Sequence, residues 1–452
     1  MNALERLADW VVNSSRQQSP DNLDRAVNSL IDTLACILSG IREPVVSKLY
    51  RSIQGNSTGQ VSAFGFGQTS AANAAMVNAT AAHSQEFDDY NRSSVAHTSA
   101  VLIPSSLAVA EQYDYSGSEC LDASIVGLEV MVYLGSVINM NHYLSGWHAT
   151  STLGSIGAAA AACRLMKLDS DKTGAALSLA TSMIGGFKLQ FGTMAKPLHA
   201  GLAAQAGINA AIMAESGITA STEVFDGNPG ITSLWSNTDP AGFAGTILPE
   251  SGKLAIEREG LFVKCYPCCG YTARAIDGMI DLATENNLDP ANIKAIEFDL
   301  PDRHAKVARF LIPENTMEAR FSFPFCLSIA ALFRSASVQH FCKEMISDAA
   351  VQRMMPRVKL NPYETDPNLE DLSPEAPDTI RVALKDGSVI EKTILYSRGS
   401  TELPLDRESL FDKFWACARN SVSTKIKKQV ESEFSNFAES QSVKRLIMRI
   451  RP

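Results

Sequence analysis

The hydrophobic pattern of the chain changes near residue 255, and this change limits the folds that are available to it. Before that point apolar residues recur at helical spacing, as between Val27 and Leu38, and strand-like alternation is nearly absent. After it, residues 293–300 alternate with period two, and residues 379–384 and 389–394 flank an Asp-Gly turn typical of a β-hairpin. The sequence therefore predicts a mainly α protein with a large all-helical domain and an inserted, smaller α+β domain.

The order of these patterns along the chain predicts the domain limits. Helical patterns fill much of the first part of the chain, and they occur at residues 69–83, 104–113, 120–139, 152–166, 171–186 and 197–216. Helical patterns at 270–287 and 323–333 lie between the predicted strands, and residues 361–377, rich in Pro, Asp and Glu, are expected to form a surface loop. We predict a helical domain over residues 1–256, an α+β domain over 257–398, and a helical return over 399–452.

Composition excludes several classes of protein. A chain of 452 residues is too long for one ordinary core. The net charge of −9 argues against a nucleic-acid partner. The apolar run Leu153–Cys163 is mostly Ala and Gly, so we expect close helix packing and no membrane span. The N-terminus lacks the pattern of a secretory signal, and the nine cysteines are then expected to be reduced thiols in a cytoplasmic protein.

Two basic side chains occur beside predicted helix starts. His148 is followed by Thr150, Ser151 and Thr152, which are good N-cap candidates, and Lys196 is followed by Pro197, which suits the first helical position. The free N–H groups of a first helical turn and a nearby cation favour binding of a carboxylate. The His148 segment and the Lys196 segment each fit an ordinary capped helix when taken alone, but the two segments together indicate an anion site.

Two further segments carry reactive groups. Glu86, Asp88 and Asp89 follow an apolar helix and precede His97 in a polar loop, which suits acid–base chemistry but also fits a solvated helix end. Cys269 is expected at a helix N-terminus, where the pKa of a thiol falls, although a packed and inert cysteine is the alternative. The pair of Cys265 and Cys268 is an incomplete zinc pattern, so we expect no metal and no other cofactor.

Taken together these segments resemble the MmgE/PrpD family. The resemblance rests on the following segments, in order along the chain: Asp32-Thr33-Leu34-Ala35, Glu86-Phe87-Asp88-Asp89 with His97, Gly146-Trp147-His148, Lys196-Pro197-Leu198-His199-Ala200-Gly201, Lys264-Cys265-Tyr266-Pro267, Ala319-Arg320-Phe321-Ser322 and Asp412-Lys413-Phe414. It implies a helical domain with an inserted α+β lid, an active site in the cleft between them, and a homodimer formed through the helical domain.

The resemblance also implies roles for individual residues. The residues that it places in catalysis are His148, Lys196, His97, Asp88, Asp89 and Cys269, and those that it places in substrate binding are Glu86, Tyr90, His199, Lys264 and Arg320. Members of the decarboxylase type resemble this chain less at two positions, because they have a His in place of Cys269 and a Tyr in place of Phe325. We predict from this difference that decarboxylation of cis-aconitate is negligible.

The reactions of this family build negative charge on a carbon beside a carboxylate, so cations must stabilise the substrate and a base must reach the C–H bond. We therefore expect a cofactor-independent lyase, with a small di- or tricarboxylate as its substrate, that dehydrates a citrate-like acid such as 2-methylcitrate. The alternatives are an isomerase or epimerase that exchanges an α-proton of an iminodisuccinate-like dicarboxylate, a cis-aconitate-type decarboxylase, and a relative that binds carboxylates without turnover.

Overall fold

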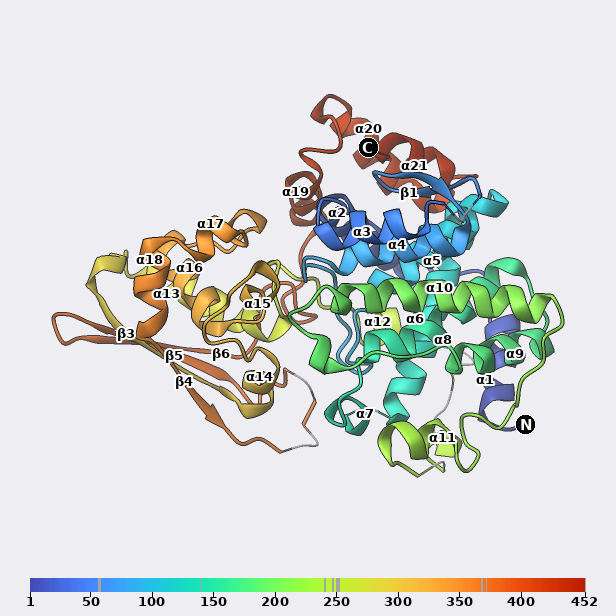
Figure 1. Ribbon diagram of the computed structural model, residues 1–452, viewed down its shortest axis with the longest axis horizontal. Coiled ribbons are helices and arrows are strands. Elements are labelled where there is room, and N and C mark those ends of the chain that lie inside the picture. Colours follow the sequence, from blue (N-terminus) through green and yellow to red (C-terminus); the bar gives the residue numbers. More distant parts are fainter. Residues whose placement is uncertain are drawn as a thin grey trace.

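The computed structural model describes residues 1–55, 58–138, 140–239, 241–245, 248, 253–366, 369–370 and 372–451. A large helical part and a smaller part with a four-stranded sheet lie side by side (Figure 1). Each part has its own cluster of buried apolar residues, and the last helices of the chain lie against the helical part. The expected fold class, a large helical domain with a smaller α+β domain, is confirmed.

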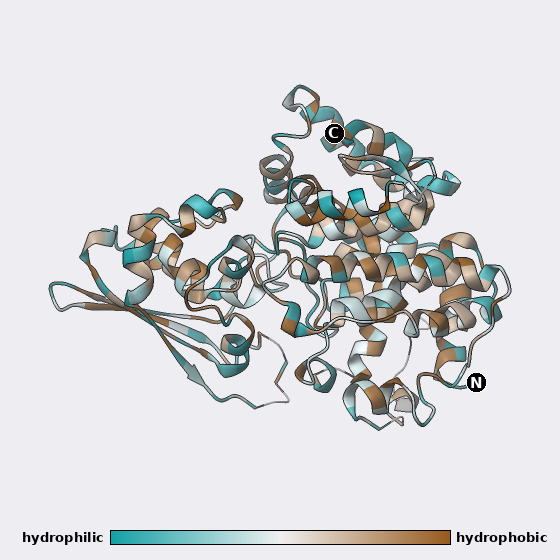
Figure 2. Ribbon diagram, viewed as in Figure 1, coloured by the Kyte–Doolittle hydropathy of each residue, from teal (hydrophilic) through white to brown (hydrophobic). Residues whose placement is uncertain are grey.

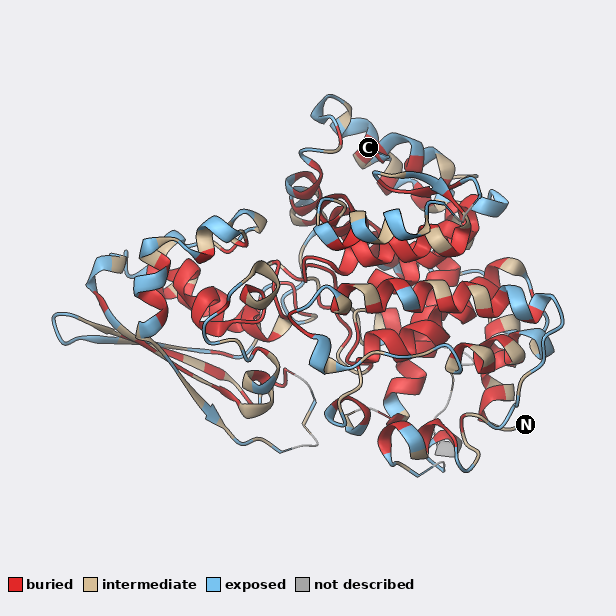
Figure 3. Cartoon of the chain, in the orientation of Figure 1, coloured by how far each residue is buried: buried red, intermediate tan, exposed pale blue. Residues whose placement is uncertain are grey.

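The helical part is built around long helices that are rich in Ala and Gly. Its helices before the inserted part are α1 (Ala3–Asn13), α2 (Pro20–Gly40), α3 (Pro44–Ile53), α4 (Ala71–His83), α5 (Ser99–Tyr113), α6 (Gly117–Ile138), α7 (Asn141–Leu144), α8 (Ala149–Met166), α9 (Ser170–Thr181), α10 (Ala195–Glu215), α11 (Gly242–Gly245) and α12 (Ala255–Arg258). Helix α8 packs against α6, α9 and α10, and buried residues fill the contacts between them (Figure 3). A Cβ atom at Gly207 would lie 2.5 Å from the Cβ of Ala158, so the close approach of α10 to α8 requires glycine there.

Helix α6 has the length and apolar composition of a membrane-crossing helix, which the sequence analysis overlooked. Most of its most apolar stretch is buried inside the protein, and buried Asp122 and Glu129 make polar contacts from it. In Figure 2 the central helices of the bundle are largely apolar or neutral, whereas hydrophilic residues gather on the outer helices. We therefore interpret α6 as a core helix of the bundle.

The smaller part combines a mixed sheet with helices on one face. Its strands are β3 (Ile293–Pro301), β4 (Val358–Tyr363), β5 (Asp378–Leu384) and β6 (Val389–Ile394), in the order β4-β3-β5-β6. Its helices are α13 (Ala273–Glu285), α14 (Asp302–Val307), α15 (Thr316–Ala319), α16 (Phe323–Phe333), α17 (Lys343–Ile346) and α18 (Ala349–Met354). Alternate residues of β3 and β5 are buried, as a half-covered sheet requires, and α13 and α16 pack on one another beside the sheet (Figure 1).

After the sheet the chain returns to the helical part. Helix α19 (Arg407–Ala418) packs against α2, and α20 (Lys427–Ser435) and α21 (Lys444–Ile450) follow it, at the top of Figure 1. The N-terminal and C-terminal segments of the chain therefore share one core, in which Leu34 and Phe414 are both buried.

Three local predictions were wrong. Residues 358–363, placed partly in a surface loop, form β4, and Pro362 is accommodated because β4 is an edge strand that pairs only with β3. A short hairpin of β1 (Val61–Ala63) and β2 (Gly67–Thr69) occurs in the helical part, where no strand was expected. Helix α9 ends at Thr181 and not at residue 186, and the segment that follows it lies beside the site described below.

Candidate active site

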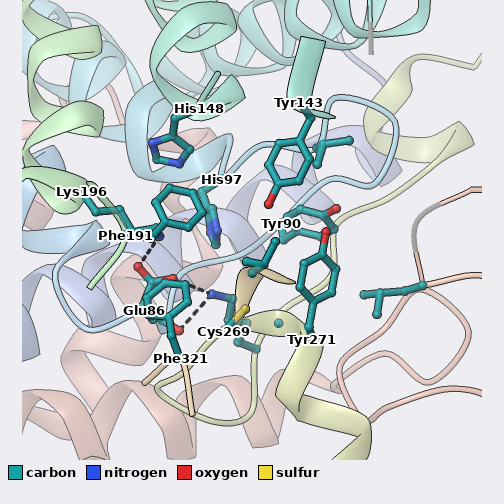
Figure 4. Close-up of a pocket in the computed structure, with 15 residues that line it drawn as sticks. Glu86, Tyr90, His97, Tyr143, His148, Phe191, Lys196, Cys269, Tyr271 and Phe321 are labelled. Atoms are coloured by element: carbon teal, nitrogen blue, oxygen red, sulfur yellow. Dashed lines mark hydrogen bonds and ion pairs between the residues drawn. The ribbon is translucent and has the colours of Figure 1, made fainter. Parts of the chain in front are cut away.

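A cavity of about 40 Å³ lies where the two parts meet, and most of the predicted site residues line it (Figure 4). Its lining residues are Glu86, Tyr90, Val95, His97, Tyr143, His148, Phe191, Lys196, Lys264, Cys269, Gly270, Tyr271, Val307, Phe321 and Leu372. Segments that are far apart in the sequence therefore bring two lysines, two histidines and a carboxylate together around one small space.

The loop after α4 is strained where it lines the cavity. Glu86 and Val95 have positive φ angles of 55° and 47°, which L-residues adopt rarely and β-branched Val very rarely. The Lys264 ammonium donates a hydrogen bond to the backbone carbonyl of Glu86 at 3.0 Å, which helps to hold this conformation. Backbone strain of this kind is held by surrounding contacts and is concentrated at functional sites.

Glu86 is a buried carboxylate between two lysines. The Lys196 ammonium pairs directly with one of its oxygens, and the Lys264 Nζ lies 3.6 Å from the other. Burial alone would raise the pKa of Glu86, but the charges of Lys196 and Lys264 outweigh it and hold the pKa at about 2. Two ammonium groups therefore flank one carboxylate in this part of the cavity, and these ammonium groups are the cations that a substrate carboxylate can contact.

A second network joins two histidines through Asp88. The Nδ1–H of His83 donates to Asp88 Oδ2 at 2.8 Å, and Nδ1 of His97 lies 3.2 Å from the same oxygen. His83 Nε2 then accepts from the Lys196 ammonium at 3.0 Å. Burial favours the neutral carboxyl of Asp88, but the two histidines outweigh this and lower its pKa well below the usual value. Asp88 is therefore an acceptor that orients both rings.

His97 and His148 are neutral bases in this environment. Burial and the nearby charge of Lys264 lower the pKa of His97 to about 4, and burial and Lys196 lower the pKa of His148 well below its usual value. Because Nδ1 of His97 faces Asp88, the proton belongs on Nδ1 and the lone pair on Nε2. Nδ1 of His148 lies 3.0 Å from Nδ1 of His199, so one of these rings donates to the other.

The helix starts differ in detail from the sequence prediction. Helix α8 begins directly after His148, which is itself the N-cap residue, so Thr150, Ser151 and Thr152 lie within the first turn. Lys196 is the second residue of α10 and lies inside the first turn, with Pro197 third and not first. Both basic side chains nevertheless lie at helix N-termini, where unpaired N–H groups and the helix dipole favour anions.

Four predicted site residues lie behind the cavity and do not line it. Asp88 orients the histidines, and His199 contacts His148. Asp89 accepts a hydrogen bond from the Ser99 N–H at the start of α5, and burial together with the charge of Asp32 raises its pKa to about 7. Arg320 donates to the Ser84 carbonyl and to Glu43, so it connects the inserted part to the loop before Glu86. Arg320 therefore links the two parts of the chain and does not line the cavity, and its role in substrate binding stays a prediction.

Cys269 and Phe325 are the two positions at which the sequence differs from members of the decarboxylase type, and only Cys269 lines the cavity. Cys269 lines the cavity at the start of a short 3₁₀ turn (Gly270–Thr272), as expected from its place before a helix. Burial, however, raises the pKa of its thiol to about 12, which favours the packed cysteine over the reactive thiolate. Phe325 is fully buried inside the second core, where its ring packs against Phe341, and it does not reach the cavity.

Among the described residues, His83, Asp88 and His97 form the one cluster with the spacing of metal ligands. Their ligand atoms lie within 4.8 Å of one another, so the donor set fits a divalent transition metal. The same atoms already contact one another, and the Lys196 ammonium beside His83 would repel a cation. The cluster therefore serves better as a hydrogen-bond network than as a metal site.

Several lining residues were missed by the sequence analysis. Tyr143, Tyr271, Phe191 and Phe321 line the cavity but were not selected as site residues, although Phe321 belongs to the segment 319–322 that carries the family resemblance. His83, which connects Asp88 to Lys196, was not selected as a site residue either. Its position in the last turn of an Ala-rich helix, five residues before Asp88, was the available signal.

Comparison with known proteins agrees with this fold. The model of the MmgE/PrpD N-terminal domain matches residues 5–244, and that of the MmgE/PrpD C-terminal domain matches residues 266–437. The chain is 30% identical over 366 residues to cis-aconitate decarboxylase of Homo sapiens, covering 77% of this chain and 73% of the relative. It is 28% identical over 360 residues to the Mus musculus cis-aconitate decarboxylase, with 76% and 71% covered. It is also 30% identical over 285 residues to the cis-aconitate decarboxylase-like protein oryM of Aspergillus oryzae, with 60% and 59% covered. The chain belongs to the MmgE/PrpD family.

Proposed function

We propose that the chain is a lyase that removes a proton from a carbon beside a carboxylate of a citrate-like di- or tricarboxylate and then eliminates water. One observation carries this proposal: the ammonium groups of Lys196 and Lys264 line the same small cavity as the neutral imidazoles of His97 and His148. Cations beside neutral bases suit a reaction in which negative charge develops on a carboxylate as a C–H bond breaks.

The proposed steps assign a task to each group. The substrate carboxylate binds Lys196 and Lys264, which stabilise the charge that moves onto it when the proton leaves. The proton passes to Nε2 of His97, and the nearby Asp88 carboxylate, 3.2 Å from Nδ1, stabilises the resulting imidazolium. The β C–O bond then breaks as the C=C bond forms, and the departing oxygen takes a proton from a cavity phenol, Tyr143 or Tyr271, and leaves as water. His148 is a second neutral base that lines the same cavity.

Decarboxylation is the second candidate, because the known relatives reported above are named cis-aconitate decarboxylases. Loss of CO₂ leaves the same kind of carbanion, which must then be protonated. The sequence argument against this reaction used Phe325, which the structure removes from the cavity, and Cys269, whose raised thiol pKa makes it a poor acid. The phenols of Tyr143 and Tyr271 are alternative donors, and the retained argument against decarboxylation is therefore Cys269 alone.

Product analysis tests the proposal and separates the two reactions. The protein is incubated with citrate, 2-methylcitrate and cis-aconitate, and each reaction is followed by ultraviolet absorbance and by CO₂ release. A rise in absorbance from a new C=C bond without CO₂ supports dehydration. Release of CO₂ from cis-aconitate at about 1 s⁻¹ or faster identifies a decarboxylase. No change with any of the three acids contradicts both assignments.

The homodimer and the cytoplasmic location remain part of this proposal. The outward side of α10 exposes Leu202, Ile212 and Met213, which is an apolar surface that a second copy of the chain would cover. Light scattering that gives twice the chain mass of 48.7 kDa supports the dimer, and a mass near 48.7 kDa at micromolar concentration contradicts it.

A further inference from the structure

The catalytic cavity is too small for the substrate that the proposed function requires. Its volume of about 40 Å³ holds about three water molecules, whereas sites for small organic ligands are commonly 300 Å³ or larger. A larger cavity of about 460 Å³ adjoins it and shares Tyr143, Phe191, Tyr271 and Val307 with it. A citrate-like acid with its reacting carbon in the small cavity must therefore extend into the larger one.

The larger cavity has a strongly positive lining. Its described lining residues include four cations, Lys188, Arg303, Lys306 and Arg309, and one carboxylate, Asp302. Two of the cations are occupied, since Arg303 donates to the carbonyls of Leu369 and Glu370 and Lys306 pairs with Asp302 at 2.6 Å. Arg303 keeps its positive charge, because carbonyl groups do not neutralise it, but both of its terminal nitrogens are engaged. Lys188 and Arg309 are the two lining cations without such partners among the described residues.

Lys188 and Arg309 have no ion pair with any carboxylate among the described residues. The Lys188 ammonium lies 3.9 Å from the centre of the Tyr143 ring, and the Arg309 guanidinium lies 5.3 Å from the centre of the Phe310 ring. Burial lowers the pKa of Lys188 to about 8, because the half-buried ammonium has lost water without gaining a carboxylate. An anion bound beside Lys188 would reverse this effect.

The backbone fixes both cations next to the catalytic cavity. The Lys188 N–H donates to the Gly146 carbonyl at 2.8 Å and the His148 N–H to the Gly186 carbonyl at 3.1 Å, so the Lys188 loop is paired with the His148 loop. Arg309 pairs with Ser322, and the neighbouring Phe310 N–H donates to the carbonyl of Phe321, which lines the catalytic cavity. One cation thus belongs to the helical part and the other to the inserted part.

We propose that Lys188 and Arg309 form a subsite for a second carboxylate of the substrate, remote from the reacting carbon, and that the bound acid spans both cavities. The inference rests on the proposed function and adds a requirement to it, namely that the substrate carries at least two carboxylates separated by several bonds. Lys188 provides a point charge and Arg309 a planar pair of donors, and together they bridge the two parts of the chain through the ligand.

The test measures binding of a non-reacting probe, so it does not depend on catalysis. Isothermal titration calorimetry gives the Kd of tricarballylate and of its terminal mono-amide, for the full chain and for Lys188→Gln and Arg309→Gln. Lys172→Gln, which removes an exposed charge on α9, is the control for non-specific electrostatics. We expect Lys188→Gln to weaken tricarballylate about tenfold. The exposed Arg309 is more screened by solvent, so we expect about threefold for Arg309→Gln and no change for Lys172→Gln.

The mono-amide distinguishes a subsite from a general effect of charge. The unaltered protein should prefer tricarballylate to the mono-amide by about tenfold, and Lys188→Gln should lose most of that preference. Equal weakening of both probes, unchanged binding in Lys188→Gln, or no binding of tricarballylate to the unaltered protein would each overturn the subsite. If these binding results hold but no acid is turned over, the proposed reaction fails and the subsite stands.

Discussion

The two walls of the catalytic cavity differ in chemistry. The wall from the helical part carries Glu86, His97, His148 and Lys196, each buried or nearly buried and each contacting another charged or polar side chain. Lys264, on the segment between α12 and α13, adds a second cation beside Glu86. The other lining groups from the inserted part are uncharged, namely Cys269, Gly270, Tyr271, Val307, Phe321 and Leu372. We infer that the helical wall performs proton transfer and charge stabilisation, while the inserted wall sets shape and supplies neutral donors.

The largest loss of activity should follow substitution on the charged wall. Lys196→Ala removes the cation beside Glu86 and His83, and His148→Ala removes a neutral base, so each should lower kcat/KM by about 10² or more. Steady-state kinetics on the acid identified above measures the effect. Lys167→Ala, at the exposed end of α8, is the matched control and should be close to the unaltered protein. Near-normal turnover by Lys196→Ala would contradict the division between the walls.

A smaller loss should follow removal of a lysine that positions the charged wall from behind. The Lys413 ammonium donates to the carbonyls of Phe87 and Lys264 at 2.7 and 2.8 Å and pairs with Asp32 at 2.6 Å. It therefore holds the two segments that carry Glu86 and Lys264, without lining the catalytic cavity.

Lys413→Met should lower kcat/KM by about tenfold, because the side chains of Lys264 and Glu86 lose their alignment. It should also destabilise the fold by about 3 kcal/mol or more, since Asp32 is left as an unpaired buried carboxylate. Adding Asp32→Asn should restore most of the thermal stability but not the activity. Full activity in this double variant would show that Lys413 has only a structural role.

Asp89, which lies behind the charged wall, should make the stability of the protein depend on pH. The pKa of its carboxyl is raised to about 7 in the folded protein, against about 3.9 in the unfolded chain. The contribution of Asp89 to the free energy of unfolding is therefore fully present below about pH 4, where the group is neutral in both states, and it is lost as the pH rises through 7. Asp89→Asn imitates the neutral form. Relative to the unaltered protein, it should gain up to about 3 kcal/mol in free energy of unfolding between about pH 5 and pH 8. Denaturant titration at both values measures this, and a difference that does not vary with pH would contradict it.

The smallest effect should come from the uncharged wall. Cys269→Ser exchanges a thiol whose pKa is about 12 for a hydroxyl of similar size, so kcat/KM should change by less than about threefold and stability only mildly. Iodoacetamide should react slowly, because little thiolate is present near neutral pH. Loss of activity in Cys269→Ser, together with rapid inactivation that substrate prevents, would place proton transfer on both walls.

The sequence was most informative where local rules decide the structure. Lys196 and His148 were predicted at helix N-termini from capping and proline patterns, and the hairpin of β5 and β6 from its Asp-Gly turn. These features depend on residues close together in the chain, so periodicity and turn chemistry indicate them without knowledge of the fold.

Features that depend on long-range packing could not be predicted. Strand β4 contains Pro362 and lacks clear alternation, and only its parallel pairing with β3 makes it a strand. Arg320 belongs to a motif of the family, yet its partners Ser84 and Glu43 show that it connects the two parts of the chain. The phenols of Tyr143 and Tyr271 reach the cavity because segments more than a hundred residues apart meet there.

The most direct test of the central claim is proton NMR of the protein with citrate, 2-methylcitrate and cis-aconitate in D₂O. If the charged wall removes a proton beside a carboxylate, the unaltered protein should introduce deuterium at that carbon of at least one acid, with or without a new product. Lys196→Ala should abolish this exchange while the fold persists. Absence of deuterium and of product with all three acids, or unchanged exchange in Lys196→Ala, would contradict the account.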